Sequence, residues 1–68
     1  MTIEHQMASR ERLLTMTQVR ERVTLSKQEI YRRIKRGEFP RQVRIGASRV
    51  AWVESEIQEW IAQAISNR

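Results

Sequence analysis

Cysteine is absent from this 68-residue sequence, and histidine, proline and glycine are nearly so. Without cysteine the chain has neither a disulfide framework nor a thiolate metal site. The one histidine, His5, has no other metal ligand spaced near it, so we expect a solvated side chain and no bound metal. The remaining residues offer no nucleophile–base pair and no glycine loop that could cradle a phosphate. The sequence therefore predicts no cofactor and no enzymatic activity.

Long apolar runs are absent as well. No stretch approaches the roughly 20 residues that a membrane span requires, and the N-terminus lacks the apolar segment of a secretory signal. We therefore expect a cytoplasmic protein with no membrane partner. A chain of this length forms one small domain, which buries only about 60% of the surface of its unfolded state and cannot enclose a substrate cavity.

Acidic residues are few where basic residues are concentrated. Residues 10–49 contain twelve of the thirteen Lys and Arg residues and four of the eight acidic residues, so twelve minus four gives this segment a net charge of +8. Residues 50–68 contain one basic and three acidic residues, a net charge of −2. A basic block of this kind implies a surface that faces a polyanion. Composition alone fits duplex DNA, RNA and an anionic membrane equally well.

Two helix-capping patterns follow one another along the chain. Thr15-Met16-Thr17-Gln18 and Ser26-Lys27-Gln28-Glu29 each fit a capping box, in which two side chains satisfy each other's free backbone N–H groups. The first box predicts a short helix from about Met16 to Val23. The second predicts a helix from Ser26 to about Arg36, which Gly37 ends.

From Val43 onward the spacing of apolar residues changes from that of a helix to every second residue, as in a β-strand. Val43 and Ile45, with Val50 and Trp52, are predicted to share one apolar face of a β-hairpin whose turn is Gly46-Ala47-Ser48. The residues that alternate with them, including Ala51, are expected to face outward.

A last helix is predicted from apolar residues spaced at i, i+3, i+4, i+7 and i+8. These residues are Ile57, Trp60, Ile61, Ala64 and Ile65. Ser55 with Gln58 offers a cap, and the alternative is a start one or two residues earlier. Trp52, Trp60 and Phe39 all fall on apolar phases and are expected to form most of a thin core.

These elements together predict a mainly α fold with a small β-hairpin, that is, a winged helix-turn-helix of three helices and a two-stranded wing. Residues 1–11 show neither periodicity nor a cap, so we expect a disordered N-terminal tail there. The folded domain is then expected over residues 12–68.

The second predicted helix is the candidate DNA-reading element. Ile30 and Ile34 form its buried stripe, and the rest of its surface is basic. Its N-terminal residues would meet base edges in the major groove, where Gln28 can pair with adenine and Arg32 or Lys27 with guanine. The candidate contact residues here are Ser26, Lys27, Gln28, Tyr31, Arg32, Lys35 and Arg36. The alternative is a solvated basic face without a binding role.

The predicted hairpin supplies a second set of candidates. Arg44 and Arg49 flank its tip together with Ser48, and Arg41 lies at its base. Arginines on a narrow ribbon can reach a minor groove or the neighbouring phosphates. Alternatively, Arg49 pairs with an acidic residue of the last helix.

The chain resembles the AlpA family of small prophage-associated transcriptional regulators, which are related to excisionases and to the winged-helix domain of MerR-type regulators. The resemblance covers about residues 12–65 and rests on the following runs: Leu13-Leu14-Thr15, Leu25-Ser26, Ile30-Tyr31-Arg32, Arg36-Gly37-Glu38-Phe39-Pro40, and Trp52-Val53-Glu54-Ser55-Glu56-Ile57 with Trp60-Ile61. It implies a winged helix that places Ser26–Arg36 in the major groove and uses Gly46–Arg49 as the tip of the wing. The chain departs from the family at Thr24, where the family usually has glycine.

Three functions follow from the sequence. The first is a sequence-specific regulator of a phage or prophage that binds double-stranded DNA and associates with the nucleoid when bound. The second is an excisionase-type factor that bends DNA for an integrase. The third, from a different class, is a protein-interaction module whose basic helix docks an acidic partner. Self-association or cooperative binding on DNA is expected, because a single module of this size covers little DNA.

Overall fold

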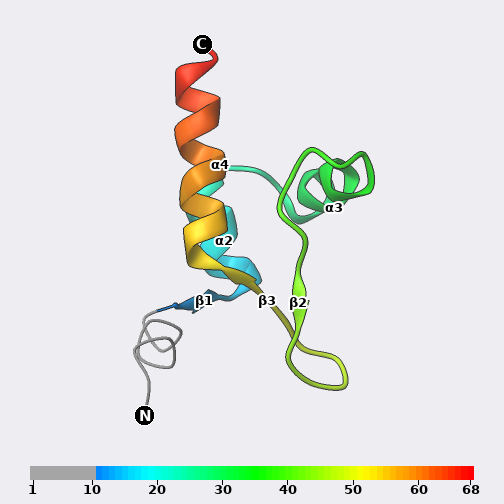
Figure 1. Ribbon diagram of the computed structural model, residues 1–68. Helices are drawn as coiled ribbons and strands as arrows, with labels where there is room; N and C mark the ends of the chain where they lie inside the picture. The colour runs from blue at the N-terminus through cyan, green and yellow to red at the C-terminus, as the bar shows by residue number, and fades with distance from the viewer. Residues whose placement is uncertain (1–10) are drawn as a thin grey trace.

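The computed structural model describes residues 11–68, which form three helices beside a small antiparallel sheet (Figure 1). The elements follow the chain in this order: β1 (Leu13–Leu14), α2 (Met16–Val23), α3 (Lys27–Lys35), β2 (Val43–Arg44), β3 (Val50–Val53) and α4 (Glu54–Ser66). This arrangement confirms the predicted mainly α fold with a hairpin wing. Of the predicted tail, residues 1–10 lie outside the described residues, and its disorder stays a prediction.

The sheet has three strands in the order β1-β3-β2, where two strands were predicted. Strand β3 is central and pairs antiparallel with both neighbours. Leu14 lies opposite Trp52 on one side of β3, and Arg44 lies opposite Val50 on the other. The additional strand β1 has only two residues, which is too short for a period-two pattern to be visible in the sequence.

The first predicted capping box is complete, whereas the second is only half formed. At α2 the Thr15 hydroxyl accepts from the Gln18 N–H at 3.1 Å, and the Gln18 side chain accepts from the Thr15 N–H at 2.9 Å. At α3 the Ser26 hydroxyl accepts from the Glu29 N–H at 3.1 Å. The Glu29 carboxylate does not return this bond, because it pairs with two arginines of its own helix.

Two left-handed residues end the two helices of the helix-turn-helix. Thr24 has φ 57° and closes α2 by donating its N–H to the Arg20 carbonyl at 2.8 Å. Gly37 has φ 74° after the end of α3, as the sequence predicted. Glycine adopts this conformation without strain, whereas a β-branched threonine is a genuine outlier there.

Helix α4 begins directly after β3 at Glu54, and its N-cap Val53 makes no side-chain bond. Ser55 is therefore not the cap, and the earlier of the two starts that the sequence allowed is the one observed. The Ser55 hydroxyl instead donates to the Glu11 carboxylate at 3.1 Å and lies in the first turn. Only the N-terminal part of the apolar stripe is covered, because the C-terminal turns of α4 project beyond the rest of the molecule (Figure 1). Ile57 is fully buried, whereas Ile65 is 54% exposed.

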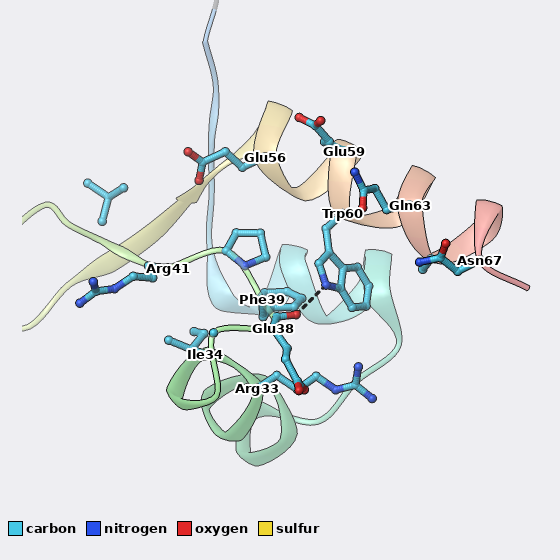
Figure 2. A pocket seen from close by; sticks show the side chains of 14 residues that line it. Arg33, Ile34, Glu38, Phe39, Arg41, Glu56, Glu59, Trp60, Gln63 and Asn67 are labelled. Atoms are coloured by element: carbon cyan, nitrogen blue, oxygen red, sulfur yellow. Dashed lines mark hydrogen bonds between the residues drawn. The ribbon is translucent and has the colours of Figure 1, made fainter.

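Trp60 joins α4 to the loop that follows α3 (Figure 2). Its indole N–H donates to the Glu38 carbonyl oxygen at 2.9 Å, and its ring meets the Phe39 ring edge-on with centroids 4.9 Å apart. The side chain is half-buried and packs at the margin of the core. The expectation that Trp60 belongs to the core is thus correct only in part: the side chain packs against the core, but no element of residues 11–68 covers its outer side.

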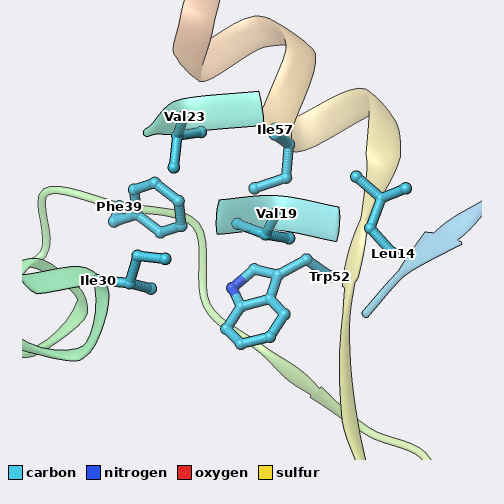
Figure 3. Packing of buried hydrophobic residues seen from close by; sticks show 7 residues of the cluster. All are labelled: Leu14, Val19, Val23, Ile30, Phe39, Trp52 and Ile57. Atoms are coloured by element: carbon cyan, nitrogen blue, oxygen red, sulfur yellow. The ribbon is translucent and has the colours of Figure 1, made fainter. Parts of the chain in front are cut away.

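The core gathers seven buried residues from five elements and the loop after α3 (Figure 3). They are Leu14, Val19, Val23, Ile30, Phe39, Trp52 and Ile57. Trp52 is the largest fully buried side chain, and its indole N–H donates to the Pro40 carbonyl oxygen at 3.1 Å. Fully burying an isoleucine or valine side chain contributes about 1.5–3 kcal/mol. Ile30 therefore fixes α3 to the core by one face and leaves its opposite face outside.

The predicted apolar face of the hairpin is wrong in part. Val43 and Ile45 on the β2 side are 38% and 48% exposed, although both were assigned to the buried phase. Ala51 was assigned to the outward phase and is buried next to Trp52. The alternation fails because β2 is an edge strand that no other element of residues 11–68 covers, whereas β3 is central and has a neighbouring strand on each side.

Candidate nucleic-acid interface

The outward face of α3 carries three exposed polar residues. Ile30 is fully buried, and side chains about half a turn away from it on a helix point to the opposite side. The exposed residues on that side are Gln28, Arg32 and Lys35, whereas Lys27 is exposed in the first turn, on the side of Ile30. A nine-residue helix is about 14 Å long, which matches a major groove about 12 Å wide.

Tyr31 differs from the other α3 candidates. The sequence placed it on the exposed face, but its side chain is half-buried and packs against the core. Its ring lies 6.2 Å from that of Trp52, measured between centroids, in a tilted arrangement. The residue is at the border of the outward face because it lies only one position from Ile30 along the helix. Ile34, predicted to be buried, is likewise half-buried.

Two carboxylates form ion pairs with three arginines in α3 and directly after it. Glu29 accepts from Arg32 and from Arg33, each at 2.9 Å, through its two separate oxygens. The hydrogen bond from Arg33 keeps the pKa of the Glu29 carboxyl below its ordinary value, and the charges of Arg32, Arg33 and Arg36 act in the same direction. Beyond the helix, Arg36 pairs with Glu38 at 3.2 Å. Three arginines of this segment are therefore partly neutralised.

Five of the sequence-predicted candidates make no ion pair within residues 11–68. They are Lys27 and Lys35 on α3, Arg41 in the following loop, Arg44 on β2 and Arg49 beside the turn. All five side chains belong to exposed residues. We refer to these residues as the unpaired cations. Exposed cations without a carboxylate partner are the groups that neutralise phosphates most readily, since no existing ion pair must be broken.

The wing is a short loop between two paired strands. The Ile45 N–H donates to the Arg49 carbonyl oxygen at 3.0 Å and thus closes the predicted turn of Gly46, Ala47 and Ser48. Ser48 and Arg49 are both exposed. The alternative pairing of Arg49 with the last helix does not form. Glu54 instead accepts from Arg22 at 2.8 Å, so that this ion pair joins α2 to α4.

Helix α3 and the wing lie along the same edge of the molecule, opposite β1 and α4 (Figure 1). Strand β2 runs between the end of the α3 loop and the wing tip, so Arg41 and Arg44 fall between the two ends. At the N-terminus of α3 the Ser26 hydroxyl uses an oxygen lone pair for the Glu29 N–H. Its own O–H and the first helical N–H groups can therefore still donate to a phosphate.

An open groove of about 950 Å³ lies between α4 and the segment after α3, and Arg41 is among its lining residues (Figure 2). Phe39, Pro40 and Trp60 line it, with Glu56 and Glu59 on the α4 side. None of its lining residues is a serine, cysteine or histidine. In the described part of the chain, no helix has the length and hydropathy to cross a membrane, and no three potential metal ligands gather at one place.

Comparison with known proteins agrees with these features. Residues 12–65, which run from the start of β1 almost to the end of α4, match the family described as "Prophage CP4-57 regulatory protein (AlpA)". The chain is also 42% identical over 60 residues to "Uncharacterized protein ORF88" of Enterobacteria phage P4, a match that covers 88% of this chain and 68% of that relative. The chain therefore belongs to the AlpA family of prophage regulatory proteins.

Proposed function

We propose that the chain is a sequence-specific, double-stranded DNA-binding regulator of phage or prophage genes. The observation that carries this proposal is the distribution of the unpaired cations over α3, β2 and the wing, along one edge of the molecule. Membership of a regulatory family supports the same function.

In this proposal α3 enters the major groove and reads bases. Gln28 lies in the first turn of α3 and is exposed, and its amide can accept and donate at the same time. Such an amide matches the N6 and N7 positions of adenine. Arg32 lies one turn further along the same face and can donate to guanine. Residues of this kind specify a sequence because each base pair presents a different pattern of donors and acceptors in the major groove.

The remaining cations act on the DNA backbone in this proposal. Lys27 and Lys35 flank the reading residues on α3, and Arg41, Arg44 and Arg49 extend the contact toward the wing. Phosphate contacts fix the register of the protein on the duplex without reading its sequence. The exposed aromatic platform of a single-strand binder is missing from this face, since Tyr31 packs inward. Duplex DNA is therefore the polyanion that this surface fits best.

Enrichment from a pool of random-sequence duplexes tests the proposal. The native chain is incubated with the pool, bound duplexes are recovered and amplified over several rounds, and affinities for the enriched and a scrambled duplex are measured by fluorescence anisotropy. We expect a short consensus and a clear preference for the enriched duplex. Recovery of unrelated sequences bound with equal affinity would contradict sequence-specific binding, and absence of binding would contradict the whole proposal.

A further inference from the structure

Glu29 is the one acidic residue in the reading helix α3, and its carboxylate is not used for capping. At α2 both bonds of the capping box are present, whereas at α3 only the bond to the Ser26 hydroxyl forms. The Glu29 oxygens are turned along the helix instead, one to Arg32 and one to Arg33, each at 2.9 Å. Spacings of three and four residues with the glutamate N-terminal to the arginine are the favourable geometry on a helix.

The two arginines lie at different places relative to the outward face. Arg33 is half-buried on the flank of α3, whereas the Arg32 side chain is 61% exposed on the same face as Gln28. Glu29 is closer to the flank and only 25% exposed. The ion pair therefore draws one nitrogen of Arg32, Nη1, toward the flank and leaves Nη2 and Nε without a carboxylate partner. Arg32 is the one α3 cation on the outward face that Glu29 restrains in this way.

We infer that Glu29 is a positioning residue for DNA recognition, which restrains Arg32 so that the chain binds arbitrary duplexes less tightly and discriminates better between sequences. This inference rests on the proposed function. A phosphate competes directly with Glu29 for the Arg32 guanidinium, and its negative charge is repelled by the carboxylate. A guanine edge is uncharged and needs only the donors that the ion pair leaves available.

Replacement Glu29→Gln tests the inference, because it removes the negative charge with little change in shape. Probes are the duplex enriched by the native chain and a scrambled duplex of the same composition. We expect the variant to bind the scrambled duplex about three- to fivefold more tightly, with a salt slope steeper by about one unit, because Arg32 gains a phosphate contact. Affinity for the enriched duplex changes less, so that the ratio of the two affinities falls.

Two further variants separate positioning from other effects. Glu59→Gln removes the same charge from α4, outside the face that carries Arg32, and is expected to leave the affinity ratio unchanged. In an Arg32→Ala background, Glu29→Gln is expected to have no further effect on the ratio, since Glu29 acts through Arg32. A thermal melt of each variant shows whether the fold is kept.

Equal weakening on both duplexes with a lower melting temperature would mean that Glu29 only stabilises α3, and would overturn the inference. If Glu29→Gln and Glu59→Gln changed the affinity ratio equally, the effect would come from the net charge of the chain alone, and this result would also overturn the inference. In both cases the native chain still prefers its enriched duplex, so the proposed function stands. If the native chain binds neither duplex, the proposed function fails and the role of Glu29 fails with it.

Discussion

The indole N–H of Trp52 donates to the carbonyl oxygen of Pro40 at 3.1 Å, so that the largest buried side chain ties β3 to the loop following α3. Trp60 makes a similar bond to Glu38 from α4, but it is only half-buried. The two tryptophans thus differ in what their removal leaves behind. Losing Trp52 creates a cavity in the centre of the core, whereas losing Trp60 opens a site that solvent can fill.

We predict that Trp52→Ala is largely unfolded at room temperature. Truncation of a buried tryptophan costs about 3–5 kcal/mol, which equals the whole stability of about 3–5 kcal/mol expected for a domain of this size. Trp60→Ala is expected to stay folded with a loss of about 2 kcal/mol, and Glu59→Ala to change stability by less than about 0.5 kcal/mol. Circular dichroism melts of the three variants check this order. An unfolded Trp60→Ala beside a folded Trp52→Ala would reverse our assignment of the core.

Thr24→Gly is expected to stabilise the chain. A left-handed conformation costs a non-glycine residue about 1–2 kcal/mol, part of which is offset by the greater freedom of glycine in the unfolded chain. We expect a net gain of about 0.5 kcal/mol and a rise of the melting temperature of about 3 °C. Thr17→Gly is the matched control, because Thr17 lies in the first turn of α2, where glycine relieves no left-handed backbone and is expected to cost up to about 0.5–1 kcal/mol. A fall in melting temperature for both variants would show that Thr24 carries no strain.

Acid is expected to destabilise the native chain partly through Glu29. Because the pKa of Glu29 is lowered in the folded state, chiefly by the hydrogen bond from Arg33, the unfolded chain binds a proton first as the pH falls. The contribution of Glu29 to stability is present above the ordinary pKa of about 4.3 and is lost as the pH drops through the lowered value. Thermal melts from neutral pH to about pH 3 should show a smaller acid loss for Glu29→Gln than for the native chain. An identical pH profile would mean that the ion pairs do not hold in solution.

Gln28 and Arg49 are expected to contribute to binding in different ways. Gln28→Ala should cost about 1–3 kcal/mol on the enriched duplex and relax the preference at one base pair, with little effect on a scrambled duplex. Arg49→Ala should weaken binding to both duplexes similarly and make the salt dependence shallower by about one unit. Anisotropy titrations with both duplexes measure these effects. If Gln28→Ala weakened both duplexes equally, α3 would not be reading bases through this residue.

Capping residues made the helices predictable, since Thr15, Ser26 and Gly37 act through contacts only a few residues apart. These local signals gave α2 and α3 to within a residue or two. The exposed face of α3 was also predictable except at Tyr31, because the buried Ile30 defines the opposite side of a helix.

Features that depend on distant segments were missed. The burial of Ala51 and the exposure of Val43 follow from which strand lies at the edge of the sheet, and no local pattern reveals that. Trp60 has the spacing of a core residue, but no element of residues 11–68 covers its outer side. At Glu29 the sequence signal was present and ambiguous, because a glutamate three residues after a serine and before two arginines can serve either the cap or the ion pairs.

The salt dependence of binding to duplex DNA tests the central claim most directly. Each phosphate that a cation neutralises contributes about −0.9 to the slope of log K against log salt concentration. If the five unpaired cations all contact phosphates, the slope for the native chain is about −4.5 between about 50 and 200 mM salt. A slope near this value would support a duplex backbone as the partner of this surface. A slope close to zero would contradict the account and point instead to a protein partner.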